Sequence, residues 1–279
     1  MKRIAGVKIT VLRVIARSLT AIVLGILGVS FLVLSPCGAR ARSGPPRTDF
    51  SAPLLPLKKG AVWVYRGSAE VAGAPESPSA APKVLRSKVV LRQKVKEVFN
   101  YQLPAGHLRI VAAIMEGHPQ DLWFYEPSRR PCSYMLVEVD SNKVGKLAKL
   151  YMIDGDPVNK IKSLIQAGKD PSCELTEADL IFQLPVQKNS CFGNTDKMQW
   201  PMFAWNVDNI ERADLSKVKK CSLSHGKFAH ASCYQLIYRA NTDHTMAGFV
   251  PGLGYVDYSG EHHGTLANFN VQLEEFYCP

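Results

Sequence analysis

The chain has 279 residues, 46% of them hydrophobic, which is enough to bury the core of one large domain or two small ones. Its formal net charge of +10 comes mainly from the first 41 residues, which hold six basic and no acidic side chains; beyond them, 28 basic residues face 24 acidic ones, a balance of +4. So small a charge gives little support to nucleic-acid binding, and the densest basic run, Lys83–Lys96, fits a solvated strand face.

Residues 1–41 have the composition of a targeting segment. A basic start is followed by an uncharged apolar stretch at 19–34 and then by small residues, the order typical of a secretory signal peptide or an N-terminal membrane anchor. The basic start favours a cytoplasmic N-terminus. We therefore expect residues 42–279 outside the cytoplasm, in a bacterial periplasm or envelope.

Three fates of this leader stay open. Ala39-Arg40-Ala41 has the A-x-A spacing of a signal-peptidase site, and cleavage there would remove Cys37. Leu34-Ser35-Pro36-Cys37 resembles a bacterial lipobox, with Pro36 at the small-residue position, and would make Cys37 a lipid anchor. Uncut, the stretch is slightly shorter than the about 20 residues of a spanning helix. A retained leader or a lipid would make the membrane a partner of this protein.

Residues 42–53 form a polar, Pro-rich tether. Residues 54–279 are expected to form a single β-rich domain, with two related halves as an alternative because LLPLKKG (54–60) is echoed by FQLPVQK (182–188). Alternating apolar residues between turn signals predict strands at 61–66, 84–99, 108–115, 122–125, 134–140, 234–238, 245–250, 255–259 and 266–277.

Residues 156–168 have the pattern of a helix. Asp156 is a cap, Pro157 suits the first helical position, and Gly168 ends the segment. A second short helix is predicted at 175–182. No βαβ repeat is present, which argues against a doubly wound nucleotide-binding fold. The predicted class is α+β and mainly β: a curved antiparallel sheet or half-barrel meander with one or two short helices.

Three motifs mark this domain, each at one position: P-L-x-x-G-x-x-W-x-Y at 56–65, F-V-P-G-x-G at 249–254 and H-H-G-T at 262–265. With them, the chain resembles a group of uncharacterised bacterial exported, lipoprotein-like proteins over most of residues 54–277. The resemblance implies an envelope location and a β-rich fold, and it implies no mechanism. Members of this group tend to have G-x-x-x-G or G-x-x-W-G in the second turn. The corresponding segment here, 188–193, lacks the first Gly and contains Cys191, so the sequence leaves the conformation of this turn open.

Six cysteines follow Cys37, an even number that predicts disulfides in an exported chain. Cys221 and Cys233 are near enough in sequence to close a hairpin-like loop, and six buried free thiols are the alternative. No C-x-x-C pair is present, which argues against zinc ribbons and thioredoxin-like motifs. The disulfide candidates are Cys132, Cys173, Cys191, Cys221, Cys233 and Cys278.

Glu261, His262 and His263 combine side-chain types that bind metals. Adjacent strand residues point to opposite faces, so both imidazoles reach one ion only in a turn. His244 lies one strand earlier and is expected to approach them across the sheet. The other interpretation is a polar turn. The chain has no G-x-S-x-G elbow, P-loop or other cofactor motif, and no cofactor is predicted.

Aromatic residues gather on the predicted strands and at 198–205, where 200–203 is unusually apolar for a linking segment. Most are expected in the core; if the sheet curves, some line an apolar pocket. The leading hypothesis is a non-enzymatic envelope protein that binds an apolar ligand or an envelope protein. The alternative is a metal-dependent hydrolase using His244, His262 and His263. The predicted pocket residues are Trp63, Tyr65, Trp123, Tyr125, Trp200, Phe203 and Trp205.

Overall fold

The structure is a computed structural model. It describes residues 53–72, 83–103, 106–123, 125–126, 128–141, 147–193, 202–263 and 267–279. The predicted leader with Cys37, nearly all of the tether, and Trp200 lie outside these residues. Within them, no helix has the length and apolar character needed to cross a membrane.

One sheet of 13 strands holds most of the described chain, and all its strand pairs are antiparallel except β9 with β13. This confirms the mainly β class. The strands are β1 Val62–Ala72, β2 Val84–Gln102, β3 Leu108–Glu116, β4 Ser133–Ser141, β5 Leu147–Ile153, β6 Leu180–Leu184, β7 Cys191–Gly193, β8 Ala204–Arg212, β9 Lys220–Cys221, β10 Ser232–Arg239, β11 Asp243–Val250, β12 Gly254–His262 and β13 Ala267–Tyr277.

The strand order explains why this sheet curls. The order is β6-β5-β4-β3-β2-β1-β13-β12-β11-β10-β8-β7. The chain therefore begins in the middle of the sheet with β1 and adds strands one after another until β6 forms one edge. It then crosses to β7 at the opposite edge, and the later strands on this path return toward β1, where β13 pairs. The crossing uses only the six residues between Leu184 and Cys191, which span at most about 20 Å. A flat path of twelve strands would be about 50 Å wide. The two edges must therefore lie close together.

Side-chain contacts join these two edges without completing the ladder. The rings of Phe182 on β6 and Phe192 on β7 have centroids 6.0 Å apart. A Cβ added to Gly193 would lie 3.5 Å from the carbonyl oxygen of Leu180. The interior of the curled sheet is the hydrophobic core, and the cavity described below opens within it.

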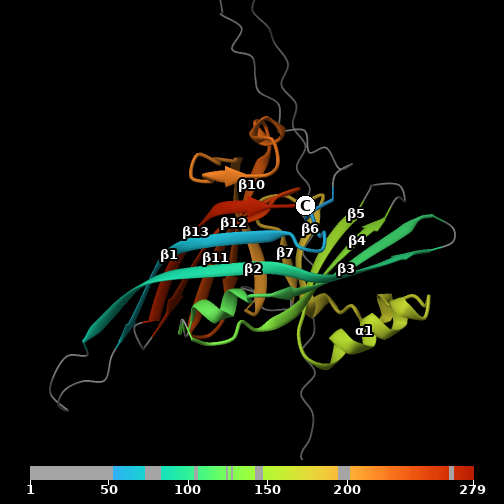
Figure 1. Ribbon diagram of the computed structural model, residues 1–279, viewed down its shortest axis with the longest axis horizontal. Coiled ribbons are helices and arrows are strands. Elements are labelled where there is room, and N and C mark those ends of the chain that lie inside the picture. Colours follow the sequence, from blue (N-terminus) through green and yellow to red (C-terminus); the bar gives the residue numbers. More distant parts are fainter. Residues whose placement is uncertain are drawn as a thin grey trace, which may run out of the picture. The chain divides into compact units, whose positions relative to one another are not determined.

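The strands β1 and β2 run side by side as the longest pair (Figure 1). Along β2, burial alternates: Val89, Leu91 and Val95 point into the core. Gln93 is buried on the same face, whereas the alternate residues of this stretch, Lys88, Val90, Arg92 and Lys94, are exposed. The basic run is therefore the solvent-facing side of an amphipathic strand, as its period of two predicts.

The predicted first helix is present as α1, Asp156–Gln166, with Pro157 in its first turn. Gly155, at φ +71°, takes the cap position instead of Asp156, and Gly168 adopts φ +65° just beyond the end. The helix buries Ile161 and Ile165. Lys162 ties it to the sheet through a 2.9 Å ion pair with Glu97.

Two predicted elements are wrong. Residues 175–182 contain the 3-10 turn η3 (Glu177–Asp179) and strand β6 instead of a helix, because Leu180, Ile181 and Phe182 are all buried where β6 pairs with β5. The predicted strand 122–125 is replaced by the 3-10 turn η1 (Pro119–Leu122) followed by Trp123. Two further 3-10 turns are η2 Ser172–Glu174 and η4 His225–Phe228.

The expectation of disulfides is not supported, because all six cysteines beyond the leader are free thiols. The pair expected to close a loop is separated by the topology. Cys221 lies on β9, beside β13, whereas Cys233 lies on β10, between β8 and β11. Cys191 instead directs its Sγ to Asn206 Oδ1 at 2.8 Å.

Candidate ligand-binding site

A cavity of about 240 Å³ lies inside the curled sheet, and we call it the His118 cavity. Its walls come from both halves of the chain: η1, the end of β5 and the η3–β6 segment on one side, and β8 and β10 to β13 on the other. The short crossing between β6 and β7 brings these elements together. The aromatic residues of the lining are Trp123, Trp205, Tyr238, Tyr255, Tyr258 and Phe269.

The strand register aligns one row of residues of this wall across five neighbouring strands. Tyr238 on β10 pairs with Trp205 on β8 and with Thr245 on β11. The row continues through Gly260 on β12 to Phe269 on β13. Gly260 leaves room for rings, because a Cβ there would overlap the Phe269 ring and lie 2.8 Å from Cζ2 of Trp123. The row thus has aromatic side chains at its two ends, Trp205 and Tyr238 at one and Phe269 at the other, with Thr245 and Gly260 between them.

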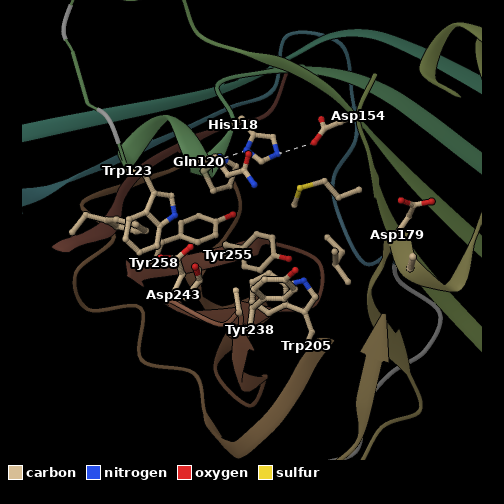
Figure 2. Close-up of a pocket in the computed structure, with 17 residues that line it drawn as sticks. His118, Gln120, Trp123, Asp154, Asp179, Trp205, Tyr238, Asp243, Tyr255 and Tyr258 are labelled. Atoms are coloured by element: carbon tan, nitrogen blue, oxygen red, sulfur yellow. Dashed lines mark hydrogen bonds and ion pairs between the residues drawn. The ribbon is translucent and has the colours of Figure 1, made fainter. Parts of the chain in front are cut away.

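His118 faces the cavity from the η1 turn (Figure 2). It is only 5% exposed. Its Nδ1 accepts a hydrogen bond from the backbone N–H of Gln120 at 3.0 Å. The backbone N–H of His118 donates to Asp121 Oδ2 at 3.1 Å. Since Nδ1 is an acceptor, the neutral ring carries its proton on Nε2. This Nε2 is 3.5 Å from Asp154 Oδ2 and has no hydrogen-bond partner within the described residues.

Tyr255 places a second polar atom on the wall. It is 5% exposed, and its hydroxyl has no hydrogen-bond partner in the described part of the chain. Burial raises the pKa of this phenol, so the hydroxyl stays protonated at physiological pH. The residue is held from behind, where the Tyr65 hydroxyl donates to the Tyr255 carbonyl at 2.9 Å.

The charged side chains of the lining are acidic. Asp154, Asp179 and Asp243 all border the cavity, and no Lys or Arg is among the described residues that line it. Asp154 and Asp179 lie at one side of the cavity and Asp243 at the other (Figure 2). Asp243 Oδ1 is buried and lies 3.5 Å from His262 Nε2, yet it accepts no hydrogen bond from a described residue.

The structure brings two of the predicted pocket residues, Trp123 and Trp205, to this cavity. Tyr125 borders a separate hollow beside Arg129, and Phe203 is 44% exposed away from the lining. Trp63 and Tyr65 are core residues. Trp63 Nε1 donates to the Leu253 carbonyl at 2.7 Å, and Tyr65 packs edge-on against Tyr258.

The predicted metal residues lie on β11 and at the end of β12. His244 is opposite Glu261 in the register, and His263 Nε2 is 3.2 Å from His244 Nδ1. His262 is opposite Asp243, so strand alternation places it on the other face. In the described ranges, no three His, Cys, Asp or Glu side chains are grouped to hold a metal ion. The metal site stays a prediction.

Sequence reasoning missed His118, Asp154, Tyr238, Tyr255 and Tyr258 as residues of one site. The segment at 117–119 has a turn composition, which hides the cap that His118 forms with Asp121. Tyr238, Tyr255 and Tyr258 lie in predicted strands, but a strand pattern does not tell which inward ring packs and which borders a cavity. That distinction depends on contacts between distant segments.

No protein-family model and no curated protein matches the chain. Matching solved structures include an inferred exported protein with a YmcC-like fold from Bacteroides fragilis, at 11% identity and a TM-score of 0.36. They also include an inferred lipoprotein from Parabacteroides distasonis, at 12% identity and a TM-score of 0.31. Each alignment covers 81% of this chain and 99% of the other. These identities and TM-scores are too low to transfer a function.

Proposed function

We propose that this chain is an extracytoplasmic envelope protein that binds a small molecule in the His118 cavity. One observation carries the proposal. Two deeply buried polar atoms border an aromatic-lined cavity without a hydrogen-bond partner among the described residues: Tyr255 Oη, and His118 Nε2, which lies 3.5 Å from Asp154 Oδ2. Buried polar groups in folded proteins are nearly always paired, because an unpaired group costs about 1–3 kcal/mol. A ligand with polar groups would satisfy both atoms.

The composition of the lining supports the same conclusion. Ligand sites are concave and mostly apolar, with a few convergent polar groups that fix orientation. The six rings supply the apolar surface, and His118 and Tyr255 supply the fixed polar groups. Two of the rings, Trp205 and Tyr238, are already arranged side by side, with centroids 5.3 Å apart. The site is therefore largely preformed, which reduces the ordering cost of binding.

The location outside the cytoplasm rests on the leader at residues 1–41. Cleavage would release the protein, whereas an uncut leader or a lipid on Cys37 would keep it at the membrane. The proposed cavity functions in either case, because its walls come from residues 118–269.

The first experiment is a titration of the full chain with N-phenyl-1-naphthylamine, a neutral aromatic probe that fluoresces in apolar surroundings. We expect saturable binding, and we expect Trp205→Leu to weaken it about tenfold, because a ring of the wall is lost. Phe203→Leu is the matched control, since Phe203 lies two residues away but outside the lining. Absence of saturable binding, or equal affinity of both variants, would contradict the proposal.

A further inference from the structure

We propose that the His118 cavity selects an organic cation, a ligand that carries an ammonium or quaternary ammonium group together with a hydrogen-bond acceptor. The inference deepens the proposed function and depends on it. It concerns which chemical class fits the cavity, and three independent properties of the lining support it.

The first property is charge. The chain as a whole has 34 basic and 24 acidic residues. The described residues of the cavity lining reverse this balance: they include Asp154, Asp179 and Asp243 and neither Lys nor Arg. An anionic ligand would be repelled by these carboxylates and a cation would be attracted, although solvent screens Asp154, whose side chain is 57% exposed.

The second property is the ring content. A cation is attracted to the face of an aromatic ring within about 6 Å of its centroid, most strongly for Trp and then for Tyr. The lining offers Trp123 against Phe269, with centroids 4.9 Å apart, and Trp205 against Tyr238. Trp123, Tyr258 and Asp243 all line the same cavity (Figure 2). Rings and carboxylates are thus available to one ligand.

The third property is the set of polar atoms without hydrogen-bond partners in the described chain. Tyr255 Oη offers lone pairs that an ammonium group or its polarised C–H groups can approach. Asp243 Oδ1, which lies 3.5 Å from His262 Nε2, adds a carboxylate oxygen to the same wall. His118 Nε2 is a donor, because Nδ1 already accepts from Gln120. Its complement is an acceptor oxygen on the ligand. A short amino alcohol has both parts, and we use choline as the probe.

The test compares choline with 3,3-dimethyl-1-butanol, its neutral isostere, as competitors of N-phenyl-1-naphthylamine bound to the full chain. We expect choline to displace the probe with at least about tenfold higher affinity than the isostere, because only the cation gains from rings and carboxylates. Equal potency of the two compounds would overturn the cation inference. Displacement by the isostere alone would overturn it as well.

Asp→Asn variants test the contribution of the carboxylate charges without changing the size of the side chains. Asp243→Asn and Asp154→Asn preserve size, and we expect each to weaken choline several-fold while the affinity for the neutral isostere stays unchanged. Asp208→Asn removes the same charge from an exposed position on β8 outside the lining, and we expect no effect. If Asp208→Asn weakens choline as much as the cavity variants do, the effect is long-range and the assignment of these carboxylates is wrong.

Failure of this inference is distinguishable from failure of the proposed function. If the neutral probe binds and the isostere displaces it as well as choline does, the cavity is a ligand site without cation preference. If no compound binds, the proposed function fails. Phosphocholine separates two sources of the same group: binding as tight as that of choline points to a lipid headgroup, and weaker binding points to a free quaternary ammonium compound. Both results retain the cation.

Discussion

The carboxyl group of Glu138 lies in the interior, 2% exposed, where it holds the beginning of the described chain. Its two oxygens accept hydrogen bonds from the backbone N–H groups of Leu54 and Leu55 at 3.0 and 3.2 Å. Burial raises the pKa of Glu138 above its ordinary value, and these two donors only partly oppose the effect. One acidic residue on β4 thereby fixes a segment 84 residues earlier in sequence.

This raised pKa predicts a pH-dependent stability. The folded state binds the proton of Glu138 more tightly than the unfolded state, so the contribution of this group is largest below the unfolded pKa and is lost as pH rises through the folded pKa. We expect the difference in unfolding free energy between the wild type and Glu138→Gln to shift toward the variant between pH 4 and pH 7. Urea unfolding at both pH values measures this shift. A difference that is constant, or that shifts toward the wild type, would contradict it.

At the scale of elements, the strands β6 and β7 show how aromatic packing replaces missing hydrogen bonds. Phe182 is fully buried at this seam and touches rings on three other strands: Phe192 at 6.0 Å, Tyr234 at 5.1 Å and Phe249 at 4.4 Å between centroids. The side chain of Phe182 therefore packs the edge strand β6 against strands β7, β10 and β11 of the second half of the sheet.

Removing the Phe182 ring should weaken the packing between β6 and the strands opposite it. We expect Phe182→Ala to lower the free energy of unfolding by about 3–5 kcal/mol, because a large buried side chain is replaced by a cavity. Phe203→Ala, at an exposed phenylalanine, should cost much less. Chemical denaturation of both variants provides the measurement, and similar losses in the two would mean that Phe182 is not a packing centre.

At the scale of the whole molecule, the strand order makes the fold independent of covalent cross-links. The first strand, β1, pairs with the last, β13, over ten residue pairs, so the ends of the folded chain are joined by a backbone ladder. The core extends over both meanders and includes Cys233, whose pKa burial raises to about 12. A thiol in such surroundings is unreactive while the protein is folded.

The thiols give a test of this view. We expect iodoacetamide, applied without reductant, to label all six cysteines beyond the leader after unfolding in urea, and to leave Cys233 unlabelled in the folded protein. Peptide mass spectrometry identifies each site. Unlabelled cysteines after unfolding, with labelling restored by reductant, would reveal disulfides and contradict the free-thiol state.

Several features followed from local chemistry and were predicted from the sequence: the mainly β class, a helix predicted at 156–168 and found at Asp156–Gln166, and most of the longer strands. In each case the signal lies within one segment, as in the alternation of Val89, Leu91 and Val95 with basic residues. Strands β5 and β8 and the short strands β6, β7 and β9 were not predicted. The two-residue strand β9, for example, is defined only by its pairing with β13, more than fifty residues further along the chain.

The sequence by itself therefore determined that an apparent targeting segment precedes a β-rich domain whose strands bury one face. Only the tertiary structure decided where the site lies. The aligned row of wall residues in the His118 cavity depends on strand register, and His118 meets Tyr255 only because the sheet curls between β6 and β7. Register and curvature arise from long-range pairing and packing, which no single segment of the sequence contains.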